Sequence, residues 1–112
     1  MPTTIRSLEA KLENGEPLTM LTAYDAPIAR LVDAGGVDMI LVGDTAGHNH
    51  LGYEDTLPVT MDEALSNTAA VSRAAESAMV IGDMPFLSYG TSLETSVENA
   101  GQIGRASCRE RV

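Results

Sequence analysis

Apolar residues follow two different spacings along this chain, and the spacing changes at regular intervals. Short apolar runs bounded by glycine, proline or polar residues are typical of β-strands, whereas apolar residues three or four positions apart are typical of amphipathic helices. The short runs predict strands at residues 18–23, 37–42 and 78–82. The helical spacing predicts helices at residues 3–14, 26–34, 60–75 and from Ser92 onward.

Capping residues support these boundaries. The predicted helices begin at side chains that can accept a hydrogen bond from the first turn, namely Thr3 or Thr4, Asp25, Thr60 and Ser92. The pairs Asn14-Gly15 and Gly35-Gly36 end the first two helices. On three of the helices the spacing also predicts a buried face. These faces comprise Ile5, Leu8 and Leu12; Ile28, Leu31 and Val32; and Ala64, Leu65, Thr68 and Val71.

The order of elements, one helix and then three strand–helix repeats, predicts the fold class. The run Val37–Val42 is nearly continuous in apolar residues, which is typical of a parallel strand covered on both faces. Alternating strands and helices predict an α/β fold with right-handed crossovers. A chain of 112 residues has room for one domain only. The polar stretch Ala46–Pro58 is long enough to predict a functional loop.

Charge and hydropathy narrow the possible partners and the compartment. The formal net charge of −9 predicts that phosphate backbones are repelled, so nucleic acid is not an expected partner. No apolar run approaches the roughly 20 residues of a membrane helix, so no membrane partner is expected. The first residues lack a basic segment followed by an apolar one, as a signal peptide has, so a cytoplasmic location is expected.

Acidic residues follow the predicted strands. Asp25, Asp44 and Asp83 each stand where a strand ends, and parallel strands end on one face of a sheet or barrel, where ligands bind. Two such carboxylates could hold Mg²⁺, which prefers oxygen ligands. The alternative is that such an aspartate only caps the next helix or forms a turn. Asp25 is assigned to this alternative. Asp44 and Asp83 remain candidates because each directly follows an apolar strand.

Other potential sites are weaker. His48-Asn49-His50 could be a metal-binding pair on an extended strand, but no third ligand is near in sequence, and a solvated loop is the favoured interpretation. Cys108 has no second cysteine with which to form a redox motif. No strand is followed by a phosphate-binding glycine pattern.

Five segments together resemble one enzyme family. They are Thr-Ala-Tyr-Asp at 22–25, Leu-Val-Gly-Asp-Thr at 41–45, Leu-Gly-Tyr-Glu-Asp-Thr-Leu-Pro-Val-Thr at 51–60, Gly-Asp-Met-Pro-Phe at 82–86 and Glu-Asn-Ala at 98–100. Each segment alone is a weak signal, but all occur in the right order. With them, residues 2 to about 101 resemble the N-terminal part of the ketopantoate hydroxymethyltransferases, also called 3-methyl-2-oxobutanoate hydroxymethyltransferases.

The resemblance implies a (βα)₈ TIM barrel of the phosphoenolpyruvate/pyruvate-domain superfamily, preceded by an extra helix. Residues 1–102 would supply that helix and the first three βα units. The implied reaction is transfer of a hydroxymethyl group from 5,10-methylenetetrahydrofolate to 3-methyl-2-oxobutanoate, which gives 2-dehydropantoate for pantothenate biosynthesis. A homo-oligomer is expected for the full-length protein.

The resemblance also implies roles for individual residues. Asp44 and Asp83 match the family's Mg²⁺ ligands, and Asp44, Thr45 and Asp83 match its contacts to the keto acid. An α-keto acid can chelate Mg²⁺, and the cation then stabilises the enolate formed when the neighbouring carbon loses its proton. Thr45 can donate to the substrate carboxylate. The loop 46–58 is hypothesised to close over the site and exclude water.

Several family residues have no match here. The third carboxylate, the substrate-binding lysine and the glutamate general base come from later strands of a barrel that needs around 250 residues. Without the base, proton abstraction has no catalyst. We therefore predict that no catalytic residue is present and that this polypeptide by itself is inactive.

The last ten residues differ in composition from the rest. Residues 1–102 carry 15 acidic and four basic side chains, whereas Arg105, Arg109 and Arg111 lie in the last eight residues. Residues 103–112 do not resemble the family. They can be encoded by a string that resembles a common short-read sequencing adapter in reverse complement. We predict that residues 103–112 are a non-native tail; a natural basic tail is the alternative.

Two other functions remain open. A Mg²⁺-dependent lyase or mutase of the same superfamily would share the barrel and the strand-end acids, although the segment 52–60 favours the hydroxymethyltransferase. A small non-catalytic α/β binding module, complete as it stands, is the alternative from another class.

Overall fold

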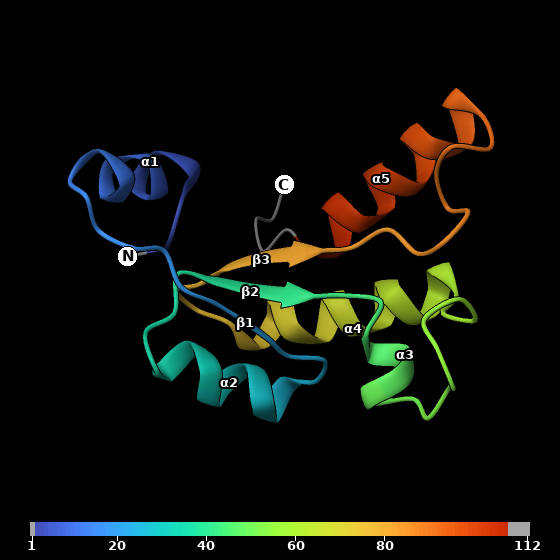
Figure 1. The fold of residues 1–112 in the computed structure, drawn as a ribbon, viewed down its shortest axis with the longest axis horizontal. Helices are drawn as coiled ribbons and strands as arrows, with labels where there is room; N and C mark the ends of the chain where they lie inside the picture. Colours follow the sequence, from blue (N-terminus) through green and yellow to red (C-terminus); the bar gives the residue numbers. More distant parts are fainter. Residues whose placement is uncertain (1, 108–112) are drawn as a thin grey trace.

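The computed structural model describes residues 2–107 of the chain, in which three parallel strands are joined by helices (Figure 1). The sheet order β1-β2-β3 follows the chain, as expected for consecutive βα units. None of the helices within the described residues is long and apolar enough to cross a membrane. The elements are α1 (Ile5–Glu13), β1 (Met20–Thr22), α2 (Ala26–Ala34), β2 (Met39–Val42), α3 (Ala46–Asn49), α4 (Met61–Ala74), β3 (Met79–Gly82) and α5 (Leu93–Ser107).

The register of the strands sets two opposite edges. Met39 of β2 pairs with Met20 of β1 and with Met79 of β3, and Val42 pairs with Gly82. We call the edge at which β2 and β3 end the carboxyl rim, and the edge at which they begin the amino rim. Figure 1 shows α1 beside the amino rim and α3 beyond the carboxyl rim. The strand-end acids therefore emerge on the side of the sheet opposite to α1.

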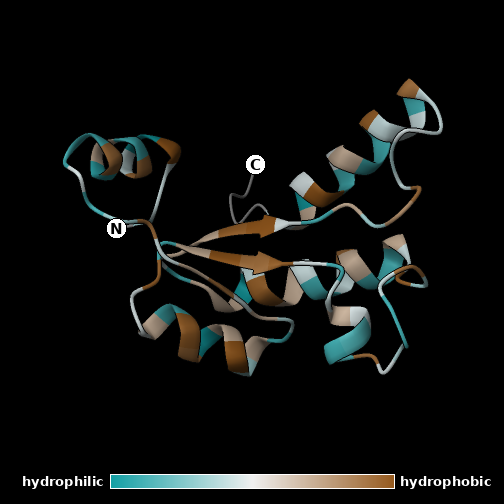
Figure 2. Ribbon diagram, viewed as in Figure 1, coloured by the Kyte–Doolittle hydropathy of each residue, from teal (hydrophilic) through white to brown (hydrophobic). Residues whose placement is uncertain are grey.

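Only one face of the sheet is covered. Ile40 and Val42 of β2 are 0% and 3% exposed and pack in a core with alanines and Val71 from the helices α2 and α4. Met39 and Leu41, which alternate with them, are only half-buried. Figure 2 shows the strands as the most hydrophobic segments. The expectation that β2 is covered on both faces is therefore wrong for the described residues, because α2 and α4 lie on the same side.

The helices begin where the sequence predicts. Thr4 caps α1 and Thr60 caps α4, each in a capping box with the residue three positions later. Asp25 accepts a hydrogen bond from the Ile28 amide and so caps α2. The Ser92 hydroxyl accepts one from the Thr95 amide at the start of α5. The strands lie at the predicted places but are shorter by one to three residues.

The predicted buried faces of the helices are only partly correct. On α1 only Leu8 is buried, whereas Ile5 and Leu12 are 62% and 60% exposed. On α2 Ala29 is buried, while Ile28 and Leu31 are largely exposed. The reason is that α2 packs mainly on α4 and β2, so the far side of its apolar stripe faces solvent. On α4 the buried residues are Thr68, Val71, Ser72 and Ala74, while Ala64 and Leu65 are half-buried.

A charged network ties α1 to the amino rim. Lys11 on α1 donates to Asp38 at 2.7 Å, and the Thr19 amide and hydroxyl donate to the other Asp38 oxygen. The hydrogen bond from Lys11 is the main cause that lowers the pKa of Asp38, and the same bond raises the pKa of Lys11. Asp38 is only 6% exposed, so this network fixes the strand β2 and the helix α1 relative to each other.

A second carboxylate fixes the start of β3. Asp33, in the last turn of α2, accepts hydrogen bonds from the amides of Glu76, Ser77 and Ala78, which lie 43 to 45 residues later. The Met79 amide then donates to the Asp38 carbonyl at 2.9 Å. These contacts set the register of β3 along β2, and therefore the point at which β3 ends.

Candidate functional site

The Asp83 carboxylate lies across the neighbouring strand at the carboxyl rim. The Asp83 amide donates to the Val42 carbonyl at 2.9 Å, which continues the β2–β3 pairing by one residue. A Cβ atom placed on Gly43 would stand 2.9 Å from Asp83 Oδ2, so the carboxylate occupies the space that a side chain of residue 43 would take. Asp83 is half-buried and keeps part of its surface open to solvent.

Asp44 and Thr45 follow directly in the turn after β2. Asp44 is half-buried and Thr45 is exposed. Their carbonyls accept hydrogen bonds from Gly47 and His48 in α3, so both residues are fixed by the start of that helix. Consecutive Cα atoms lie about 3.8 Å apart, so Asp44 is one residue step from the glycine that the Asp83 carboxylate covers. The two predicted carboxylates thus belong to the same rim, on adjacent strands.

The donor set suits a hard divalent cation. Two carboxylates from adjacent strand ends supply the oxygen ligands that Mg²⁺ prefers, and this ion usually binds through one or two carboxylates with water or substrate completing its shell. The Asp83 carboxylate, lying over Gly43 instead of out in solvent, fits such a role. Within residues 2–107 no group of three or more histidine, cysteine or acidic side chains gathers as a metal site, so further ligands would come from elsewhere.

The stretch 46–58 is not a simple loop, because Ala46–Asn49 form the short helix α3. The chain after α3 is tied back by the Tyr53 amide, which donates to the Gly47 carbonyl at 2.7 Å. The Tyr53 hydroxyl donates to Glu63 at 2.7 Å, at the start of α4. The amide of Thr60 is the main cause that lowers the pKa of Glu63, and the bond to Glu63 raises the pKa of Tyr53. The segment next to Asp44 is thus anchored at both ends.

The histidines do not form a metal pair on an extended strand, because His48 lies in α3 and His50 directly after it. The His48 Nδ1 atom lies 3.3 Å from the Tyr53 carbonyl, and the His50 ring lies 6.1 Å from the ring of Tyr24. Both histidines are exposed, as a solvated loop would have them, but the expected loop is wrong at this place because His48 lies in the helix α3. Cys108 lies outside the described residues.

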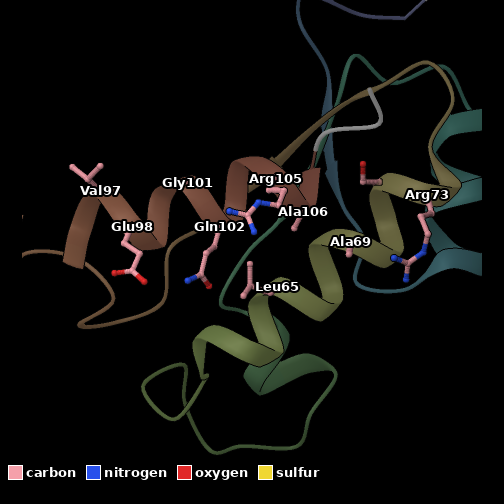
Figure 3. A pocket seen from close by; sticks show the side chains of 10 residues that line it. Leu65, Ala69, Arg73, Val97, Glu98, Gly101, Gln102, Arg105 and Ala106 are labelled. Atoms are coloured by element: carbon pink, nitrogen blue, oxygen red, sulfur yellow. The ribbon is translucent and has the colours of Figure 1, made fainter. Parts of the chain in front are cut away.

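A groove of about 1020 Å³ lies away from these acids, between α4 and α5 (Figure 3). Glu98 and Gln102 of α5 face it from one side, and Leu65 and Ala69 of α4 from the other. It contains no pair of carboxylates, and its lining comes from the helix layer, not from strand ends. The carboxyl rim, where Asp44 and Asp83 emerge, is therefore the candidate site despite the size of this groove.

Two residues near the site were missed by the reasoning from sequence. For Gly43 the available signal is the glycine itself, since a glycine beside a strand often marks close approach by a neighbouring group. For Glu63 it is the spacing from Thr60, which is that of a capping box. No sequence pattern indicates the hydrogen bond between the Tyr53 hydroxyl and the Glu63 carboxylate.

The family model and the curated relatives that match this chain all belong to the same enzyme family. The family model described as "Ketopantoate hydroxymethyltransferase" matches residues 2–112. A protein from Natronomonas pharaonis named 3-methyl-2-oxobutanoate hydroxymethyltransferase is 57% identical over 88 residues, which are 79% of this chain and 33% of the relative. Proteins of the same name from Thermotoga maritima and Halobacterium salinarum are 56% and 54% identical over 83% and 92% of this chain. The chain spans about a third of the length of these curated relatives.

One solved structure shows the fold. The structure described as "Crystal Structure of Phosphonopyruvate Hydrolase Complex with Oxalate and Mg++" matches 96% of this chain and 36% of its own chain, with a TM-score of 0.76 and 20% identity. The chain thus has the predicted α/β fold of the first three βα units of a TIM barrel, preceded by α1.

Proposed function

This chain belongs to the ketopantoate hydroxymethyltransferase family, and on that premise we propose that it forms the part of such an enzyme that binds Mg²⁺ and the keto acid. The reaction is transfer of a hydroxymethyl group from 5,10-methylenetetrahydrofolate to 3-methyl-2-oxobutanoate, with 2-dehydropantoate as product. The observation that carries the proposal is the Asp83 carboxylate, which lies against Gly43 directly before Asp44. The superfamily alternative of a lyase or mutase is not favoured, because the relatives are named hydroxymethyltransferases.

The residues at the carboxyl rim then have distinct roles. Asp44 and Asp83 bind Mg²⁺, and Thr45 presents an exposed hydroxyl to the substrate carboxylate. When bound, Mg²⁺ supplies positive charge to the keto acid and so eases loss of the proton from the neighbouring carbon. The anchored segment between α3 and α4 shields the site from water at the side of Asp44. The general base belongs to the remaining two thirds of such a protein, so residues 1–102 bind but do not abstract the proton.

The proposal extends to the setting of the enzyme. A homo-oligomer in the cytoplasm, with the folate donor as co-substrate, fits a metabolic enzyme with these relatives. Residues 103–112 are proposed to be a tail from sequencing adapter read-through. Ile103 is nonetheless 7% exposed within α5, and the family match extends through this segment. The parent gene decides the question, since a genome that encodes these ten residues contradicts the adapter origin.

The function is tested in a chimera, in which the 93 matching residues of this chain replace their counterparts in the Thermotoga maritima relative. Asp44→Asn is expected to weaken Mg²⁺-dependent binding of 3-methyl-2-oxobutanoate by roughly 10- to 100-fold, measured by calorimetry with and without Mg²⁺. Asp62→Asn, at an exposed position on α4, is the matched control and keeps the affinity. Unchanged affinity in the Asp44 variant refutes the assignment.

A further inference from the structure

Gly43 allows the Asp83 carboxylate to lie where it does. Gly43 is buried between the end of β2 and the turn that begins with Asp44. The position that a Cβ of residue 43 would occupy is 2.9 Å from Asp83 Oδ2 and 3.7 Å from two carbon atoms of Leu41. The Leu41 distances are ordinary van der Waals contacts, so the carboxylate is the one group among the three nearest that a methyl group would displace.

The backbone of Gly43 does not need glycine. The glycines with positive φ among the described residues are Gly15, Gly36, Gly52 and Gly90, and Gly43 is not one of them. An alanine at position 43 therefore fits the local backbone without strain. The reason for glycine here is space for the neighbouring carboxylate.

An alanine at this position moves one functional group and leaves the fold in place. Real Cβ atoms essentially never approach another atom within 3.0 Å, so one partner must shift. The atom in the way is the far end of a flexible side chain, so the carboxylate leaves its preferred position while the packing of the core stays in place. Mg²⁺ requires oxygen ligands at about 2.0–2.1 Å in nearly ideal octahedral geometry, so a small displacement of a carboxylate weakens binding.

We infer that Gly43 is a positioning residue for the metal site, because its missing side chain holds open the place from which Asp83 meets Asp44 and the cation. The inference rests on the proposed function for the identity of the cation. The contact between Gly43 and Asp83 can be tested without it.

The experiment uses the chimera described above and three variants of it, Gly43→Ala, Asp83→Ala and the double variant. Gly101→Ala is the matched control, since a Cβ there meets nothing within 4 Å. Mn²⁺ serves as the probe, and its affinity is measured by electron paramagnetic resonance in the presence of 3-methyl-2-oxobutanoate. The urea midpoint of unfolding is measured for every variant without metal.

Gly43→Ala is expected to weaken Mn²⁺ binding by roughly 10- to 100-fold while the chain stays folded. In the Asp83→Ala background the same change has no further effect on affinity. Gly43→Ala is also expected to lower the urea midpoint less in the Asp83→Ala background than in the unsubstituted protein, because the methyl group then meets no carboxylate. Gly101→Ala keeps the Mn²⁺ affinity of the starting chimera.

Two results overturn the inference: a measurable Mn²⁺ affinity that is equal in the starting chimera and in Gly43→Ala, or midpoint changes that are the same in both backgrounds. A third result separates the two proposals. If the starting chimera binds no Mn²⁺ but the midpoint changes are non-additive, the metal assignment fails and the role of Gly43 in placing Asp83 stands.

Discussion

Removing the Asp33 carboxylate tests whether a contact far from the carboxyl rim sets the position of β3. In Asp33→Ala the amides of Glu76, Ser77 and Ala78 lose their acceptor. Those of Glu76 and Ser77 belong to exposed residues and can bind water instead. The Ala78 amide, at 2.7 Å from Asp33 Oδ1, belongs to a residue that is 1% exposed, so its acceptor is not easily replaced.

The magnitude follows from this difference. A hydrogen bond to a charged group contributes about 1.5–3 kcal/mol, and a buried donor left without a partner costs about 1–3 kcal/mol. With one such donor and two exposed ones, the free energy of unfolding is expected to fall by about 2–3 kcal/mol. Asp33→Asn keeps Oδ1 and the shape but loses the charge, so we expect about half of this loss.

Urea unfolding followed by circular dichroism measures the change. For an m-value of about 1.5 kcal/mol/M, the midpoint of Asp33→Ala should fall by about 1–2 M. Hydrogen exchange adds a local readout, since the Met79 amide, bonded to the Asp38 carbonyl, should exchange faster in the variant. Glu9→Ala, an exposed change on α1, is the control and should stay within about 0.5 kcal/mol. An Asp33→Ala variant as stable as this control refutes the reasoning.

Two further outcomes are expected. Thr68 is 0% exposed, and its hydroxyl has no hydrogen-bond partner among the described residues. Thr68→Val should therefore raise the free energy of unfolding by about 1 kcal/mol, measured by urea denaturation. A loss of stability would contradict this. Because the hydrogen bond from Lys11 lowers the pKa of Asp38 below the ordinary value of 3.8 for an aspartate, the carboxylate contributes stability above that pH and loses it as the pH falls through the lowered value. Urea midpoints between pH 7 and pH 2 should therefore depend less on acid in Asp38→Asn than in the original chain, and parallel curves would show that this network does not couple to folding.

Local chemistry explains what was predictable from the sequence. Caps, glycine stops and apolar spacing act over three or four residues, so the four longer helices α1, α2, α4 and α5 and the order of the strands were predicted correctly. The short helix α3 was missed because its four residues Ala46–Asn49 contain only one apolar side chain and have no capping hydrogen bond from Thr45.

Contacts between distant segments explain what was not predictable. The exposure of Ile28 and Leu31 depends on which neighbours α2 has, and spacing within one helix carries no information about them. For the site, the sequence correctly placed Asp44 and Asp83 after adjacent strands, because parallel strands end on one side. It did not indicate that the Asp83 carboxylate lies over Gly43, since the two residues meet only through the pairing of β2 with β3.

The salt bridge of Lys11 with Asp38 lies at the edge of the sheet opposite to Asp83. A strand of four residues is about 13 Å long, so the two ends share no direct contact. The charged network and the proposed metal ligands therefore lie at opposite ends of the same strands. Substitutions for heat tolerance could be made on the exposed side of α1, provided that the contacts of Asp33 and Asp38 that position β3 are kept.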